Sequence, residues 1–415
     1  MVFICAGAFS QPAETLSLEE CLRLSTARSP LKRQQSISGE IYQFKRQNLK
    51  SQWLPSIGIN AQASYNSETV DFSEMMENLP VSIPSLPLDQ YKAWADINQQ
   101  LYDGGAVKAR KAIEKSTYET EIQQVATELE GIKQQVIQVY FSLLLTDKST
   151  EVLTISLEEL DERKKTVLAG VENGVLLPEN MLSMQAEELR MEQKLDELKL
   201  SRIQLFHVLS VLTDSAFKGD IPVENPAEPV SFDKEIYRPE LVLFEKQKEK
   251  FTASQRLVSS TWLPRFFAFS QAAYGRPGYN AVSRDFHAFY SLGVGMKWNF
   301  LNYGDNRRQV KILDLQKEYV DTKLEVFDDQ LSIQLETERV NMEKFNEMLL
   351  KDEQIISLRK AIASASFAKL NNGVITSSDY LKEMNAELLA VLQYENHKLL
   401  KLQAAFNYLL WQGKL

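Results

Sequence analysis

The hydrophobic positions of this chain repeat with two different periods, and the change between them occurs twice along the sequence. Residues 56–65 alternate between apolar and polar side chains, which predicts a strand with one apolar face. Residues 287–300 alternate in the same way, and residues 91–101 and 265–274 are less regular candidates for partner strands. We therefore expect two hairpins, with strands at about 56–66, 91–102, 265–274 and 286–300. By pattern alone, they could be short membrane strands or a soluble sheet with one wet face.

Elsewhere the period is helical. From Tyr118 to Leu143, apolar residues recur at steps of three and four, and the same register returns from Leu331 onward. This spacing predicts long helices that pack lengthwise, as in a coiled coil. The expected helices span about 30–52, 105–168, 178–212, 239–261, 304–369 and 377–411.

The two halves of the chain share short motifs in the same order. Trp53-Leu54-Pro55 returns as Trp262-Leu263-Pro264, and Asn173-Gly174-Val175 returns as Asn372-Gly373-Val374. We infer a duplication, with a first repeat at 16–217 and a second at 232–415. The proline-containing segment 218–231 between them is typical of a linker.

Two segments outside these periodic stretches carry signals of their own. Residues 1–10 are apolar, then small, then polar, and they are typical of the remnant of a signal peptide, although a short buried strand is the alternative. Residues 66–90 contain three prolines and no periodic apolar face, which predicts a long exposed loop.

Composition excludes several classes of function. The net charge of −9 argues against nucleic acid as a partner. Cys5 and Cys21 are too few for a disulfide framework or a zinc site, and His207, His287 and His397 are far apart in the sequence. We find no catalytic grouping, phosphate loop or metal-ligand cluster, so we expect no enzyme, no cofactor and no metal. No apolar run reaches 18 residues, so any membrane crossing would have to be a β-barrel.

The duplicated order of elements, with Leu101-Tyr102-Asp103-Gly104-Gly105 and Phe300-Leu301-Asn302-Tyr303-Gly304 at the strand-to-helix junctions, resembles the TolC-like outer-membrane efflux proteins. The resemblance implies a mainly α fold with membrane β, in which a helix–β-hairpin–long helix–helix unit is duplicated. Each protomer of a homotrimer would give four strands to a 12-stranded β-barrel. The helices would form a long α-helical barrel that extends from the outer membrane into the periplasm.

In such a barrel, the apolar strand faces would meet outer-membrane lipid and the polar faces would line a wet lumen. The expected lumen residues are Ser56, Asn60, Gln62, Ser291, Lys297 and Asn299. Four tryptophans near strand ends are expected at the membrane interface: Trp53, Trp94, Trp262 and Trp298.

The resemblance implies passive conduction, as the exit duct of a tripartite efflux pump or a type I secretion system. An inner-membrane transporter would supply energy, and a periplasmic adaptor (a membrane fusion protein) would dock at the helical tips. The expected contact residues are Gly174, Val175, Leu176, Gly373, Val374 and Ile375. The alternative is that these residues are only helix caps.

A resting duct must close at its periplasmic end, and the family uses a ring of acids there. Asp379 lies at a matching position, and its equivalent in the first copy is Asn180. A second expected acid is replaced by Lys382, with Glu383 beside it. These four residues are the candidate gate, although Asp379 is also suited to cap the helix that follows the turn.

A different class of function is a coiled-coil scaffold of the periplasm. It would account for the heptads and the acidity, but not for two amphipathic hairpins at matching places. A duct for metal ions has no support, because no lining rich in Met or His stands out.

Overall fold

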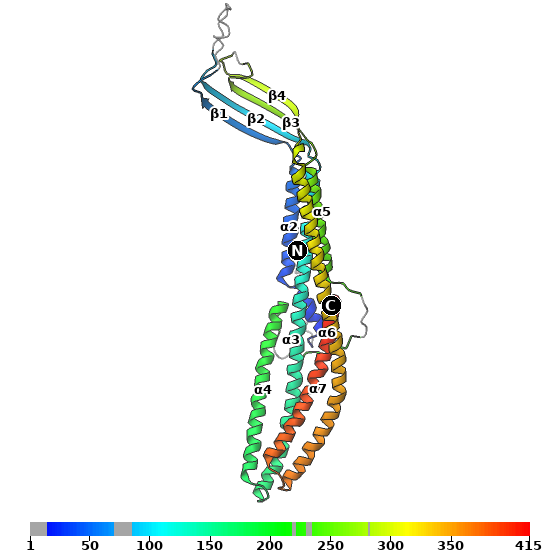
Figure 1. Ribbon diagram of the computed structural model, residues 1–415. Coiled ribbons are helices and arrows are strands. Elements are labelled where there is room, and N and C mark those ends of the chain that lie inside the picture. The colour runs from blue at the N-terminus through cyan, green and yellow to red at the C-terminus, as the bar shows by residue number, and fades with distance from the viewer. Residues whose placement is uncertain (1–14, 70–84, 218–220, 230–234, 281–282) are drawn as a thin grey trace, which may run out of the picture. The chain divides into compact units, whose positions relative to one another are not determined.

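The structure is a computed structural model that describes residues 15–69, 85–217, 221–229, 235–280 and 283–415. The expected signal remnant at 1–10 and residues 70–84 of the expected loop lie outside the described residues. The order of helix, two strands, long helix and return helix occurs twice (Figure 1), which confirms the duplicated unit expected from the sequence.

The observed helices and strands lie close to their expected positions. The first copy contains α1 (Leu18–Ala27), α2 (Pro30–Ser51), β1 (Ser56–Tyr65), β2 (Asp89–Tyr102), α3 (Ala106–Glu172) and α4 (Pro178–Thr213). The second contains α5 (Pro239–Ser260), β3 (Arg265–Arg276), β4 (His287–Lys297), a 3-10 turn (Phe300–Asn302), α6 (Tyr303–Asn371) and α7 (Ser377–Gln412). Among the helices of the described chain, none combines the length and the apolar character needed to span a membrane.

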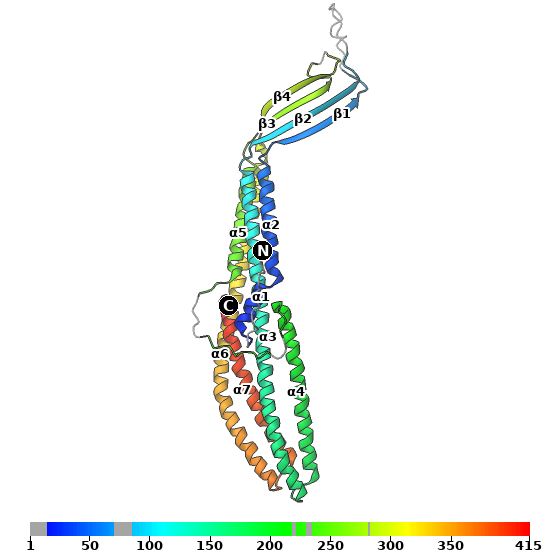
Figure 2. The same ribbon diagram turned by 180° about the vertical axis from the view of Figure 1, so that it is seen from behind.

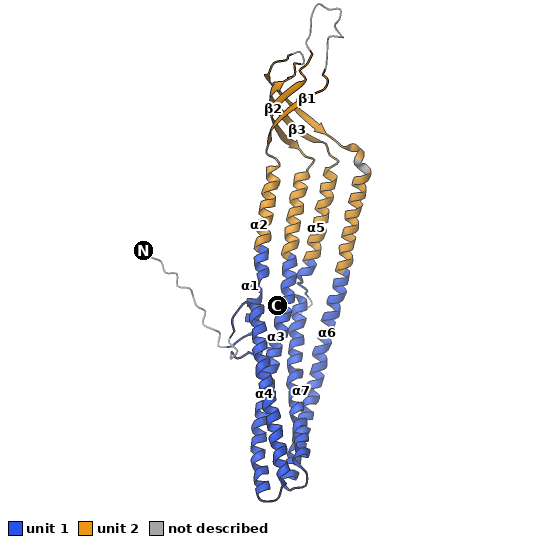
Figure 3. Cartoon of the chain, turned by 90° about the vertical axis from the view of Figure 1, so that its left-hand side faces the viewer, with its two compact units in different colours: residues 1–35, 123–241, 325–415 blue, residues 36–122, 242–324 orange. Residues whose placement is uncertain are grey.

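The chain divides into two compact units that cut across the sequence repeats. Unit 1 comprises residues 1–35, 123–241 and 325–415, and unit 2 comprises residues 36–122 and 242–324 (Figure 3). Each unit therefore takes segments from both copies. This follows from lengthwise packing, because a helix contacts the segments that lie beside it, whichever copy they come from.

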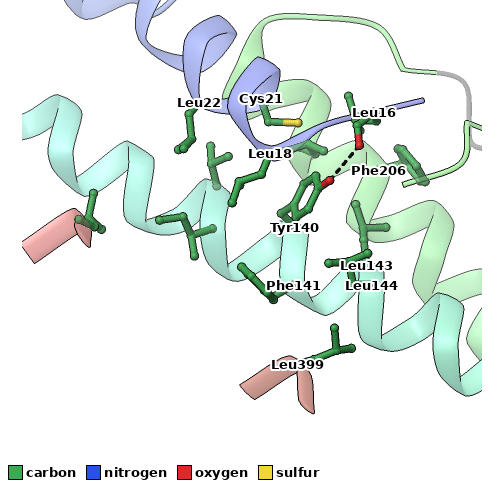
Figure 4. Packing of buried hydrophobic residues seen from close by; sticks show 14 residues of the cluster. Leu16, Leu18, Cys21, Leu22, Tyr140, Phe141, Leu143, Leu144, Phe206 and Leu399 are labelled. Carbon is green, nitrogen blue, oxygen red and sulfur yellow. Dashed lines mark hydrogen bonds between the residues drawn. The ribbon is translucent and has the colours of Figure 1, made fainter. Parts of the chain in front are cut away.

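Helix α1 was not expected from the sequence, and it contributes to a buried cluster of unit 1. The Ser17 side chain caps α1 by accepting a hydrogen bond from the backbone N–H of Glu20 at 3.3 Å. Cys21 of α1 packs in the same cluster as Tyr140 of α3, and both are fully buried. The Tyr140 hydroxyl donates to the carbonyl oxygen of Leu16 at 2.9 Å (Figure 4).

The region between the repeats also belongs to this cluster, so its described part is more than a linker. Leu16 forms a parallel β-bridge with Val223, and the Tyr140 hydroxyl also donates to the carbonyl oxygen of Glu224 at 2.6 Å. Burial raises the pKa of the Cys21 thiol to about 12, so this cysteine stays protonated and unreactive at neutral pH.

In unit 1, the lower parts of α3, α4, α6 and α7 lie side by side, as the two opposite views agree (Figures 1 and 2). A second buried cluster joins these four helices. Its members are Leu153, Leu160, Val167, Leu176, Met184, Met191, Leu370, Tyr380, Leu381, Met384 and Leu388. The shared cluster holds the α3–α4 and α6–α7 hairpins together.

Unit 2 contains one antiparallel sheet in the order β1-β2-β3-β4. The two hairpins of the sequence are joined because β2 of the first copy pairs with β3 of the second, for example at Ala95↔Ala272. In the described sheet, β1 and β4 each pair with one neighbouring strand. The sheet is therefore open at both edges.

The junction between β2 and α3 depends on Asp103 and two glycines. Both oxygens of the Asp103 carboxylate accept backbone hydrogen bonds, from Gly105 at 2.8 Å and from Val107, so this side chain caps α3. Gly104 and Gly105 both have positive φ, +71° and +87°. A Cβ at Gly104 would lie 2.6 Å from the carbonyl oxygen of Ser260, whereas a Cβ at Gly105 would meet nothing within 4 Å.

This contrast makes the two glycines a matched pair for substitution. Gly105→Ala should cost about 1–2 kcal/mol of stability through the positive φ alone. Gly104→Ala adds the clash with the Ser260 backbone, which should cost about 1–3 kcal/mol more. Thermal unfolding followed by circular dichroism should rank wild type above Gly105→Ala and Gly105→Ala above Gly104→Ala. Equal midpoints for the two variants would contradict the close approach at Gly104.

Candidate functional site

The α3–α4 and α6–α7 turns have the same backbone structure. Gly174 and Gly373 take left-handed φ values of +73° and +68°. The next residue donates back into the helix in both cases, from Val175 N–H to the carbonyl oxygen of Gly170 at 2.9 Å and from Val374 N–H to that of Lys369 at 2.9 Å. This is the helix-ending pattern that glycine permits and that the Asn-Gly pairs indicate.

The residues that follow each glycine point in different directions. Val175 and Val374 are 57% and 69% exposed, so they are free to touch a partner at the turns. Leu176, in contrast, is 7% exposed and belongs to the buried cluster, and Ile375 is half-buried and packs against it. The tip residues expected from the sequence therefore divide into an exposed pair and an anchoring pair.

Asn180 connects the two turns. It is buried, and its Oδ1 accepts a hydrogen bond from the backbone N–H of Ser377 at 2.7 Å. Since Ser377 is the first residue of α7, the first copy supplies a cap for a helix of the second. The structure thus places this candidate gate residue inside the protomer, at the contact between its two hairpins.

Asp379 forms a reciprocal capping box at the start of α7. Its carboxylate accepts hydrogen bonds from the Thr376 backbone N–H at 3.1 Å and from the Thr376 hydroxyl at 2.8 Å, and the Thr376 hydroxyl in turn accepts from Asp379 N–H. The Thr376 side chain, followed by the Thr376 backbone N–H, lowers the pKa of the Asp379 carboxyl below its ordinary value of 3.8. The exposed carboxylate is therefore charged at neutral pH.

The other two candidate gate residues lie one turn further along α7. Lys382 is exposed, and its positive charge also lowers the pKa of Asp379. Glu383 is half-buried and pairs with Arg359 of α6 at 3.2 Å. The charges of Asp379 and Lys382 therefore influence each other, whereas the Glu383 carboxylate is held by an ion pair within the α6–α7 hairpin.

Two arginines that the sequence did not single out also connect the hairpins. The Arg163 guanidinium of α3 lies 4.3 Å from the ring centre of Phe367 in α6 and 5.8 Å from that of Tyr380 in α7. Arg190 of α4 donates to the side-chain oxygen of Asn385 in α7 at 2.9 Å. Local periodicity carries no signal for such contacts, because each joins helices that are far apart in the sequence.

The register of the sheet separates an apolar face from a polar one. Directly paired residues share a face. Through the pairs Ile59↔Ala95, Ala95↔Ala272 and Ala272↔Tyr290, one side of the sheet carries mostly apolar side chains from all four strands. This face is widely exposed in the protomer: Ile59 is 87% and Val294 is 78% exposed.

Most of the expected lumen residues share the opposite face. Ser56, Asn60, Gln62, Ser291 and Lys297 are connected to that face by the same register. Asn299 lies just beyond the end of β4. The polar strand faces of the two copies thus form one continuous surface.

The four tryptophans do not occupy equivalent positions. Trp53 and Trp262 lie between a helix and a strand, and the Trp298 indole, just after β4, donates to the carbonyl oxygen of Trp262 at 2.9 Å. Trp94 lies inside β2 rather than at its end, and it pairs with Asn60 on the polar face. Strand β2 begins at Asp89, so Trp94 lies further from the strand end than the expected start at about residue 91 implied.

Within the described residues, no group of three or more His, Cys, Asp or Glu side chains could hold a metal ion. The described residues form helix caps at the two turns, contacts between the two hairpins, and a sheet with one polar and one apolar face.

Comparison with known proteins finds a family model that matches part of the chain and solved structures that share the fold of nearly all of it. Residues 40–212 match the model of the family described as outer membrane efflux protein. Among curated proteins, none matches this sequence. The family match of residues 40–212 and the shared fold agree with the expected resemblance to the TolC-like proteins.

Three solved outer-membrane proteins show the same fold over nearly the whole chain. The CmeC channel of Campylobacter jejuni is 14% identical, with 96% of this chain and 85% of that chain covered and a TM-score of 0.67. VceC of Vibrio cholerae is 11% identical, with 95% and 96% covered and a TM-score of 0.70. The open state of MtrE of Neisseria gonorrhoeae is 13% identical, with 95% and 88% covered and a TM-score of 0.69.

The capping box predicts a pH dependence at the start of α7. Because its pKa is lowered on folding, the Asp379 carboxylate stabilises this helix end above pH 3.8, and the contribution is lost as the pH falls through the lowered value. Amide hydrogen exchange at Ser377–Tyr380 should therefore accelerate, relative to its intrinsic rate, below that pH. The start of α4 is the internal control, because its N-cap residue Leu177 makes no side-chain hydrogen bond. An equal acceleration at both helix ends would rule out the capping box as the cause.

Proposed function

Residues 40–212 carry an outer membrane efflux protein domain, and from this premise we propose that the chain is the passive exit duct of a tripartite efflux pump or a type I secretion system. The observation that carries the proposal is the four-stranded sheet, with one apolar exposed face, one polar face and two open edges. A sheet of this kind suits lipid on one side and water on the other, once its edges are closed.

Closure requires further copies of the chain. An unpaired strand edge in lipid leaves backbone groups without hydrogen bonds, at several kcal/mol each. When β4 of one copy pairs with β1 of the next, each edge is satisfied in turn, and a ring results. Three copies, the number that the family resemblance implies, would give a barrel of twelve strands.

An exposed apolar stripe on α6 supports the same assembly. Tyr319, Val326, Ile333 and Val340 follow one another at intervals of seven residues, and all four are at least 45% exposed. This is the spacing of a seam that packs against another helix lengthwise. In a single copy the seam is uncovered, and a neighbouring copy of the chain would bury it.

The gate of the duct would lie at the α3–α4 and α6–α7 turns. Asp379 and Lys382 are exposed and close in sequence, so three copies would bring alternating charges around the axis. Asn180 and Glu383 would act indirectly, by holding the hairpins of one copy through Ser377 and Arg359. Opening would require the hairpins to separate, against the contacts of Asn180, Arg163 and Arg190.

The partners of the duct would meet it at the same turns. Val175 and Val374 offer exposed apolar contacts for the helical hairpins of a periplasmic adaptor, and Gly174 and Gly373 keep the turns narrow. Leu176 and Ile375 would hold these valines in place from below. An inner-membrane transporter would supply the energy, because the described chain offers binding surfaces and no reacting group.

A coiled-coil scaffold is the less favoured alternative. It would leave the apolar face of the sheet, with Ile59 at 87% and Tyr290 at 74% exposure, in contact with water. A soluble protein rarely tolerates such a contiguous apolar surface.

Membrane fractionation and mass measurement test the proposal directly. The protein should sediment with outer membranes, require detergent, run as an oligomer of three chains and conduct ions in planar bilayers. A monomer that stays soluble without detergent would overturn it.

A matched pair of variants connects this test to the α6 seam. Ile333→Glu places a charge in the seam and should shift the detergent-purified protein toward monomers. Ser332→Glu adds the same charge at the neighbouring exposed position and should leave the trimer intact. If both variants behave alike, the seam does not contact another copy.

Single-channel recording tests the role of Asp379 in the gate. Asp379→Asn removes three negative charges from the constriction, leaves those of Lys382 and should shift the ion preference toward anions. Asp196→Asn, at a 72% exposed acid that pairs with Lys199 further along α4, is the control and should change neither current nor ion preference. Unchanged current and ion preference in Asp379→Asn would leave this residue with its capping role alone.

A further inference from the structure

The polar face of the sheet carries more positive than negative charge, although the whole chain carries −9. By register, its charged residues in the strands are Lys92, Arg265 and Lys297, against Asp96. In the described chain, no ion pair involves any of the three cations. Asp96 is already engaged, because Asn60 donates to its carboxylate at 2.5 Å. The face therefore has uncompensated positive charge.

Lys92 lies among aromatic rings on this face. Its Nζ is 5.0 Å from the ring centre of Trp94 and 5.5 Å from that of Phe289. The same Nζ donates to the side-chain oxygen of Gln271 at 3.2 Å. An ammonium group has three donors, so two remain for an incoming acceptor.

Two further rings lie flat along the same face. Phe267 is opposite Gly295 and Phe269 is opposite Gly293. A Cβ added at Gly295 would be 2.5 Å from the Phe267 ring, and one added at Gly293 would be 2.8 Å from the Phe269 ring. The glycines thus leave room for the rings to cover the strand, which gives the polar face an aromatic surface.

We propose that this face binds small organic anions that carry an aromatic ring, with Lys92, Gln271 and Trp94 as the binding residues. The inference rests on the proposed function, in which this face lines the water-filled passage. A carboxylate accepts hydrogen bonds from the Lys92 ammonium group and from the Gln271 amide, and the ring of the ligand stacks on Trp94. The substrate class of the duct then includes aromatic acids.

The side chains of the polar face favour aromatic acids over neutral aromatic molecules and over small cations. A neutral aromatic molecule gains the stacking on Trp94 but not the charge-assisted hydrogen bonds. A small cation meets the uncompensated charges of Lys92, Arg265 and Lys297. On the apolar face, the charged residues of the strands are Arg276 and Asp89, and they pair with each other, so the strands offer no unpaired cation there for a carboxylate.

Photolabelling of the full-length, detergent-purified protein with 4-azidobenzoate tests the proposal. Mass spectrometry should find the label on peptides of β2 and β3, and an excess of benzoate should compete for the site whereas benzyl alcohol should not. Lys92→Gln should reduce this labelling about three- to ten-fold, the loss expected for one charge-assisted contact near water. Trp94→Leu should reduce it to a similar extent.

Arg276→Gln is the matched control, because it removes a cation from the opposite face of the same strands. It should leave the labelling of β2 and β3 unchanged. Labelling that is insensitive to Lys92→Gln, or equal competition by benzyl alcohol, would overturn the binding site. A trimer that conducts ions but shows no such labelling would sink this inference alone. A soluble monomer would remove the proposed duct whatever the labelling shows.

Discussion

The rest of the structure depends on the pairing of backbone groups at the edges of one sheet. Strands β1 and β4 each have a single neighbour in the described sheet, and the apolar face between them is exposed. Contact with water is unfavourable for that apolar face, and lipid would leave the backbone groups of those edges without hydrogen bonds. In the proposed duct, further copies of the chain would pair these edges and close the sheet, so the two open edges favour assembly. The exposed apolar side chains of the α6 seam would likewise be buried by a neighbouring copy.

The duplication supplies two similar hairpins, and the differences between the copies make them fit together. The turns share Asn-Gly-Val and the same backbone hydrogen bonds. The next positions have diverged: Asp379 caps its own helix through Thr376, whereas Asn180 caps the helix of the other copy through Ser377. Leu177 leaves the start of α4 without a side-chain cap. Two identical copies would form two self-contained hairpins, but the diverged pair forms one joined end.

Most helices and strands could be predicted because each extends over many residues of one period. The tertiary contacts could not, since a period reports which face is buried and not what covers it. Arg163 is one example, because its aromatic partners lie on two other helices. Trp94 is another: the irregular alternation around it hid both the start of β2 and the face on which it lies. Helix α1 is short, and its burial depends on Tyr140 and on the segment around Val223.

The polar face of the sheet carries a net positive charge, although the whole chain is negative. On the helices, acids and bases largely pair three or four residues apart, as Arg339 does with Glu336 and Glu343, so their charges cancel locally. On the polar face of the sheet, Arg265 lies directly opposite Lys297, a pairing of like charges that costs stability. Folding alone does not account for two cations at such a place. In the proposed duct, contact of that face with water and with anions would lower the repulsion between these two cations.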